Sequence, residues 1–144
     1  MASTGDILLL EQSDFADHMT LSIWTTGPGV ILRSVVKADP AVDNRAILAD
    51  ADGDAAEPAI GVVTVLGYPS AGQCVVKSLG VLTGFAGLTR AKRYILSKAP
   101  GGIVAADDVG NLDYPVLGDF KQTVGVARSA TELMIMVDPT TFEI

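Results

Sequence analysis

The side chains in this sequence that could do chemistry are a single cysteine, a single histidine and many acids. Cys74 lies in a strand-like Gln-Cys-Val-Val-Lys run, far in sequence from His18. A reactive cysteine needs a neighbouring histidine or another cationic group that lowers the pKa of the thiol. His18 has Asp14 and Asp17 close by, but no Gly-x-Ser-x-Gly elbow accompanies them. The sequence therefore favours a buried, structural Cys74 and a surface or interface His18.

The acidic segment 50–54, followed by Glu57, is the part most similar to a cation site. A calcium-binding EF-hand loop needs glycine at position six and glutamate at position twelve. Counted from Asp50, those positions hold Ala55 and Gly61. Asp-Gly pairs favour tight hairpins, so we expect an acidic hairpin tip here, with a looser carboxylate site as the alternative.

Two glycine-rich segments, 84–87 and 100–102, could be compared with phosphate-binding loops. Neither is followed by the Gly-Lys-Ser/Thr ending that such loops need to hold a phosphate. We therefore expect no catalytic residue, no cofactor and no metal ion, and we expect that the chain is not an enzyme.

Composition points towards assembly with other chains. The 144 residues suit one domain, 49% of them are hydrophobic and 19% are charged. Mean hydropathy is +0.39, and soluble domains usually carry about 25% charged residues. We expect that part of this apolar surface is buried against other proteins.

The charge balance excludes two classes of partner. Ten basic against seventeen acidic residues give a net charge of −7, which argues against binding to nucleic acid phosphates or to an anionic membrane surface. The longest aliphatic run has four residues, so no transmembrane helix is expected. We also expect no signal peptide, and one reduced thiol suits synthesis in a cytoplasm.

Alternating and β-branched runs predict an all-β chain. We expect a compact β-sandwich or small β-barrel with long, turn-rich loops and an extended N-terminal arm. Gly80 is expected in a turn or bulge, 107–120 as a surface-displayed loop and 140–144 as a tail. The segment 89–98 could form a helical face but is predicted as a strand. The expected strands are 19–24, 30–37, 46–49, 60–66, 73–78, 81–83, 93–97, 103–105, 123–128 and 132–137.

A weak internal similarity links two parts of the chain. A short strand, a Gly- and Asp-rich excursion and an (Ile/Val)-Gly-Val strand occur in 46–62 and again in 94–126. The glycines at the ends of the two patterns, Gly61 and Gly125, could allow a bulge or a close approach of backbones.

We divide the chain into residues 1–29, an arm or edge segment, and a β domain, residues 30–144. The arm has acids and no base, and it could reach a neighbouring subunit or add an edge strand to its own sheet. A basic cluster in the second part is either a solvated strand edge or a docking patch for an acidic partner. The expected partner contacts are Ile7, Leu8, Leu9, Leu10, Phe15 and Trp24 in the arm, and Arg90, Lys92 and Arg93 in the cluster.

From about residue 29 onward, the order of glycine-containing motifs resembles a β module of bacteriophage virions. These motifs are Ala-Ile-Gly-Val at 59–62, Ala-Gly-Gln-Cys-Val-Val-Lys at 71–77, Gly-Val-Leu-Thr-Gly at 80–84, Gly-Leu-Thr at 87–89, Arg-Tyr-Ile-Leu-Ser at 93–97, Pro-Gly-Gly-Ile at 100–103, Thr-Val-Gly-Val-Ala at 123–127 and Ser-Ala-Thr-Glu-Leu at 129–133. The order is similar to that of capsid decoration (cement) proteins and of some head- or tail-fibre domains. One departure is Arg-Ala-Lys at 90–92, where relatives more often have a glycine-containing turn.

The resemblance implies a non-enzymatic protein on the outer surface of a phage capsid. Its expected partners are the major capsid protein and further copies of itself, as a homotrimer. The alternative is a head- or tail-fibre module that recognises a host glycan or receptor. In that case Trp24, Tyr68 and Tyr114 would be stacking platforms beside the loop 107–119.

Overall fold

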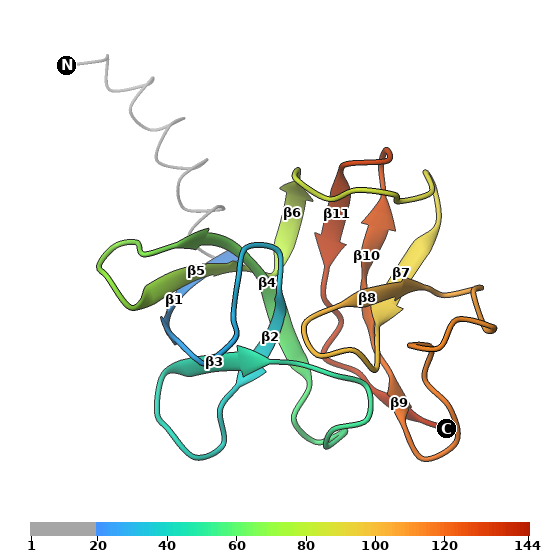
Figure 1. The fold of residues 1–144 in the computed structure, drawn as a ribbon, viewed down its shortest axis with the longest axis horizontal. Coiled ribbons are helices and arrows are strands. Elements are labelled where there is room, and N and C mark those ends of the chain that lie inside the picture. Colours follow the sequence, from blue (N-terminus) through green and yellow to red (C-terminus); the bar gives the residue numbers. More distant parts are fainter. Residues whose placement is uncertain (1–19) are drawn as a thin grey trace, which may run out of the picture.

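The computed structural model describes residues 20–144, and this part of the chain is essentially all β (Figure 1), as the sequence predicts. Five strands close a barrel, five more form a second sheet, and two short strands pair near the C-terminus. The strands are β1 (Leu21–Thr26), β2 (Val35–Ala38), β3 (Arg45–Leu48), β4 (Ala59–Leu66), β5 (Gln73–Lys77), β6 (Leu79–Leu82), β7 (Arg93–Leu96), β8 (Ile103–Ala105), β9 (Phe120–Lys121), β10 (Thr123–Ala127), β11 (Leu133–Met136) and β12 (Phe142–Glu143).

The barrel has the strand order β1-β3-β2-β4-β5 and closes through the pairing of β1 with β5. Of its pairings only that of β1 with β3 is parallel. Because β1 pairs on both sides within its own barrel, residues 21–26 add a strand to their own sheet, which was one of the two alternatives for this segment.

The second sheet has the order β6-β11-β10-β7-β8 and is antiparallel throughout. The strands β10 and β11 form the hairpin expected around residues 129–131. Segment 93–96 is a strand, so the helical alternative for 89–98 is wrong. Only Ser78 separates β5 from β6, so these two strands carry the chain directly from the barrel to the second sheet.

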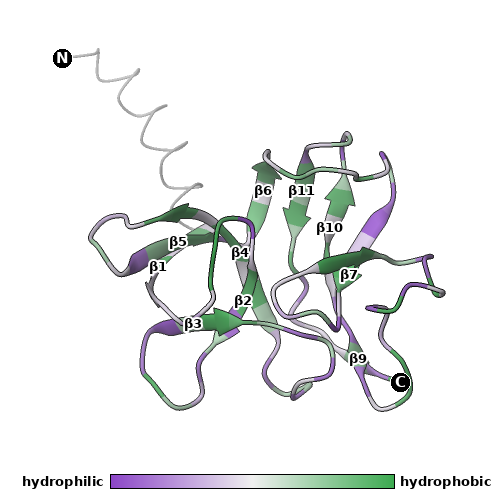
Figure 2. Ribbon diagram, in the orientation of Figure 1, coloured by the Kyte–Doolittle hydropathy of each residue, from purple (hydrophilic) through white to green (hydrophobic). Residues whose placement is uncertain are grey.

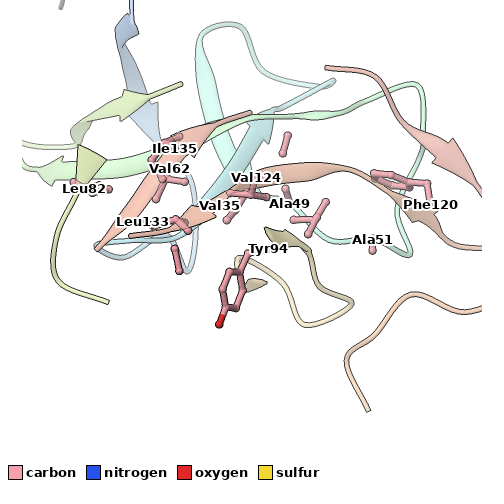
Figure 3. Packing of buried hydrophobic residues seen from close by; sticks show 13 residues of the cluster. Val35, Ala49, Ala51, Val62, Leu82, Tyr94, Phe120, Val124, Leu133 and Ile135 are labelled. Atoms are coloured by element: carbon pink, nitrogen blue, oxygen red, sulfur yellow. The ribbon is translucent and has the colours of Figure 1, made fainter. Parts of the chain in front are cut away.

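The largest hydrophobic core lies between the barrel and the second sheet (Figure 3). Val35 of β2 and Val62 of β4 contribute to this core, together with Leu133 and Ile135 of β11. The neighbouring residues Val36 and Val63 belong instead to the core inside the barrel. Both strands are therefore apolar on both faces, and Figure 2 shows that the strands of both sheets are mostly hydrophobic.

A buried glutamine ties the two sheets together. Gln122 is 1% exposed, and its side-chain oxygen accepts a hydrogen bond from the Ala59 amide at 2.8 Å. Its amide nitrogen donates to the carbonyls of Ala59 at 2.8 Å and Asp138 at 2.9 Å. A buried amide must have such partners, because an unpaired polar group in the core costs about 1–3 kcal/mol. Gln122 thus fixes the start of β4 against the second sheet.

The predictions for residues 30–37 and for Gly80 were wrong. The expected strand 30–37 starts only at Val35, because Arg33 has a φ of 70° and the Ser34 amide turns back to the Ile31 carbonyl. The positive φ allows the Arg33 guanidinium to donate to the carbonyls of Thr64 and Thr83. Gly80 lies inside β6, in register with Ile135 of β11, rather than in a turn or a bulge.

The expected tail 140–144 is partly a strand. Phe142 pairs with Lys121, and Glu143 pairs with Phe120. This pairing places Phe142 and Glu143 beside β9.

The two repeated glycines lie where backbones approach closely, as their sequence context suggested. A Cβ on Gly61 would lie 2.6 Å from the Lys77 carbonyl oxygen, and one on Gly125 would contact the Met134 carbonyl oxygen. The pairing register shifts beside both glycines, which marks bulges.

We expect Gly125→Ala to destabilise the fold by about 1–3 kcal/mol, because the added methyl group must displace the backbone of β11. Urea unfolding of the purified variant measures this. Gly110→Ala is the matched control, since a Cβ at Gly110 meets nothing within 4 Å. Equal unfolding midpoints for both variants would contradict the close approach.

The departure at 90–92 has a structural counterpart. Ala91 has a φ of 72°, a conformation that costs a residue with a Cβ about 1–2 kcal/mol and costs glycine almost nothing. The Ala91 amide donates to the Ala127 carbonyl at 2.8 Å, which holds the turn against the second sheet.

Ala91→Gly is therefore expected to stabilise the protein by about 0.5–1 kcal/mol, after allowing for the larger entropy of the unfolded glycine chain. A higher thermal midpoint for the variant supports the strained turn. A midpoint below that of the wild type would mean that the strain at Ala91 is negligible.

Candidate functional site

The expected arm contacts fall into two groups. Ile7, Leu8, Leu9, Leu10 and Phe15 lie outside the described residues 20–144. Trp24 is described and is half-buried against the core inside the barrel, and its indole N–H donates to Ser22 Oγ at 2.7 Å. On the same strand Ile23 points outward instead and is 56% exposed.

The basic cluster is only partly available to an acidic partner. Lys92 Nζ lies 2.8 Å from Asp107 Oδ2, so this cation already has a counterion. Their hydrogen bond raises the pKa of Lys92 and lowers the pKa of Asp107. Arg93 is exposed and its guanidinium reaches only the Thr123 hydroxyl, at 3.4 Å. Arg90 is exposed in the turn before β7.

The loop 106–119 presents aliphatic side chains to solvent. Leu112 is 93% exposed, Leu117 is 86% exposed and Val109 is 72% exposed, and Val116 is also exposed. Single exposed aliphatic residues are normal on soluble proteins, whereas a group of them on one loop makes that loop a candidate interaction surface. We call these four residues the aliphatic loop.

Contacts with the second sheet fix the conformation of the aliphatic loop. The Tyr114 side chain, 6% exposed, packs with Ile95 and Val104 on the second sheet, and its hydroxyl donates to the Ala106 carbonyl at 2.7 Å. Lys121 Nζ lies 5.3 Å from the centre of the Tyr114 ring, within the range of a cation–π interaction. A loop that is already ordered loses little entropy on binding, so its exposed side chains are well placed to dock.

The same contacts decide between the expected stacking platforms. The Tyr114 ring is buried under the loop and cannot stack on a sugar, whereas Trp24 is half-buried against the core inside the barrel. Tyr68 is 60% exposed and is available.

A second apolar surface lies on the outer side of the second sheet. Leu79 is opposite Met136, and Val81 is opposite Met134, which is itself opposite Val126. Leu79 and both methionines are exposed, and the two valines are half-buried. The loop covers the β7–β8 half of this side through Tyr114 and leaves these five residues uncovered. We call them the methionine face.

A cleft of about 460 Å³ opens between the turn 85–89 and the start of the loop. Phe85 and Leu88 line it with the hydroxyl-bearing Tyr94, and the polar side chains around it include Asp108 and Asn111. The Tyr94 hydroxyl accepts a hydrogen bond from the Thr89 amide. The cleft thus combines two apolar side chains with several polar groups, and its lining also includes the Lys92–Asp107 ion pair.

The acidic segment forms a turn but not the expected hairpin tip, because the strands on either side of it, β3 and β4, do not pair with each other. Burial raises the pKa of Asp50 above its ordinary value of 3.8, the neighbouring Asp52 raises it further, and Lys37 opposes both. Within residues 20–144 no group of His, Cys, Asp and Glu side chains is arranged to hold a metal ion.

A raised native pKa means that the folded chain binds this proton more tightly than the unfolded chain. The contribution of Asp50 to stability therefore falls as pH rises from the unfolded pKa through the folded pKa. Asp50→Asn removes this penalty, so its gain over the wild type should be larger at pH 7 than at pH 3. Urea unfolding at both pH values tests this, and an equal difference at the two would contradict it.

Comparison with family models, with curated proteins and with solved structures found no match to the chain. No helix among residues 20–144 has the length and apolar character needed to cross a membrane.

Sequence reasoning identified the loop but missed its side chains. The sequence predicts that the loop 107–120 is displayed on the surface, but it places the apolar partner contacts in the arm. The available signal was the spacing of Val109, Leu112, Val116 and Leu117 within a segment rich in Gly, Asp and Pro, where no regular strand could bury them.

Proposed function

We propose that this chain is a structural virion protein that binds the outer surface of a phage capsid and stabilises it. Its partners are the major capsid protein and neighbouring copies of itself in a homotrimer. The observation that carries the proposal is the aliphatic loop, which displays four apolar side chains on an ordered support.

Hydrophobic anchors suit this role because they gain free energy when a partner excludes water from them. Fully burying one leucine or valine side chain is worth about 1.5–3 kcal/mol. Leu112 and Leu117 are almost fully exposed, so nearly all of that gain remains for a partner. Three linked copies multiply such contacts through avidity.

The rest of the molecule is consistent with a passive clamp. The two sheets share one core and Gln122 bonds them together, so a load on the loop is transmitted to a rigid body. With a net charge of −7, the chain is proposed to contact capsid protein and neither nucleic acid nor membrane. It would be made in the bacterial cytoplasm and located on the virion.

The test uses purified protein and undecorated capsids, with bound protein measured by co-sedimentation. Leu112→Asp combined with Leu117→Asp should weaken binding at least about tenfold, since losing a central anchor costs about 2 kcal/mol. Both side chains are exposed, so the fold should be unaffected.

Val42→Asp is the matched control, because Val42 is also exposed but lies in the turn between β2 and β3, away from the loop (Figure 1). Unchanged binding of the double variant would remove the loop from the interface. Failure of the wild type to bind capsids would refute the decoration role itself.

A head- or tail-fibre module that recognises a host glycan is the second candidate, and the cleft favours it. Phe85 offers an apolar surface for a sugar ring, and Asp108 and Asn111 offer hydrogen-bonding groups beside it. Adding glucose, galactose or N-acetylglucosamine should then shift the NMR signals of the Phe85 and Tyr94 rings selectively. The absence of shifts with all three sugars at millimolar concentration would count against this function.

A further inference from the structure

The methionine face lies beside the point where the described chain begins. Ser78, between β5 and β6, donates to the Thr20 carbonyl from its backbone amide at 2.8 Å and from its hydroxyl at 3.2 Å. The Ser78 carbonyl accepts from the Val137 amide at 3.2 Å. Thr20 is therefore fixed next to the first residue of β6 and the end of β11. The described chain therefore begins at the edge of the methionine face.

The sequence before Thr20 matches this face in polarity. Its apolar residues are Ile7, Leu8, Leu9, Leu10 and Phe15. An apolar segment so close to an apolar face can bury both from water, which is favourable by about 25 cal/mol per Å².

The charges also match. The arm carries acids at Asp6, Glu11, Asp14 and Asp17, and no lysine or arginine. Arg93 lies opposite Val126, at the far end of the row formed by Val81, Met134 and Val126. Its guanidinium forms no ion pair with any residue of 20–144. An acidic segment on this face would supply that counterion.

The segment before Thr20 is long enough to reach across the methionine face. Phe15 is five residues before Thr20, which allows an extended reach of about 17 Å. The face from β6 to β7 spans three strand spacings, about 14 Å. A tether this short gives a millimolar effective concentration, which favours the face of the same molecule over that of another.

We propose that residues 7–17 pack on the methionine face of their own chain. The apolar residues cover Leu79, Met134 and Met136, and the acids lie towards Arg93. This inference is independent of the proposed function, and the aliphatic loop stays exposed.

The direct test is disulfide cross-linking in the purified protein. Leu9→Cys combined with Met134→Cys should form an intrachain disulfide under mild oxidation, at a rate that does not depend on protein concentration. The native Cys74 is buried and should not compete. Leu9→Cys with Leu112→Cys is the matched control, because Leu112 is an equally apolar but remote and exposed position, and it should not cross-link.

Two outcomes would overturn the proposal. One is equal cross-linking at positions 112 and 134, which would mean that the arm has no preferred site. The other is a cross-link between chains, which would assign the arm to a neighbouring copy.

Two further variants separate the apolar and charge contributions. Adding Arg93→Glu should slow the cross-link about two- to fivefold, the size expected for a surface ion pair, whereas Arg90→Glu should not. A chain that starts at residue 20 keeps all barrel strands and should bind more of a fluorescent apolar dye than the full chain. Equal dye binding by the two would contradict a covered face. None of these readouts involves capsids, so their failure and the failure of capsid binding are distinguishable.

Discussion

The structure depends on one shared core between a closed barrel and a second sheet. Val35 and Val62 contribute to this core, while their neighbours Val36 and Val63 fill the barrel. Two strands thus serve two cores at once, which requires consecutive apolar residues rather than simple alternation. The high apolar content of the sequence is used in part for this double burial. It need not all be reserved for contacts with other chains.

Close packing of the sheets imposes further constraints. Gly61 and Gly125 have no room for a side chain, since a neighbouring carbonyl occupies the space. Gln122 supplies the polar groups that the start of β4 would otherwise lack. These contacts join the barrel to the second sheet, and the strand β1 closes the barrel through its pairing with β5. A rigid unit of this kind can hold a loop in a fixed shape for docking.

Much of the fold could be predicted from local sequence, because alternation and β-branched residues indicate strands such as β4, β8 and β10. The division into a barrel and a second sheet could not, since it depends on pairings between distant segments. Arg33 illustrates the limit: its side-chain bonds to Thr64 and Thr83 stabilise a turn where local propensity favours a strand. The proposed docking surface could not be predicted for a related reason. Sequence alone does not distinguish Leu112 on a displayed loop from a leucine in a core.

We propose that this β body presents apolar side chains, chiefly Leu112 and Leu117, to a large partner. The proposed partner is a capsid with repeated sites. The most direct measurement is the mass of the free protein in solution, followed by its saturating ratio on undecorated capsids. We predict that the free protein has the mass of a trimer and that it saturates capsids at multiples of three copies. A stable trimer that never associates with capsids would contradict the proposed capsid binding and favour the glycan-binding module.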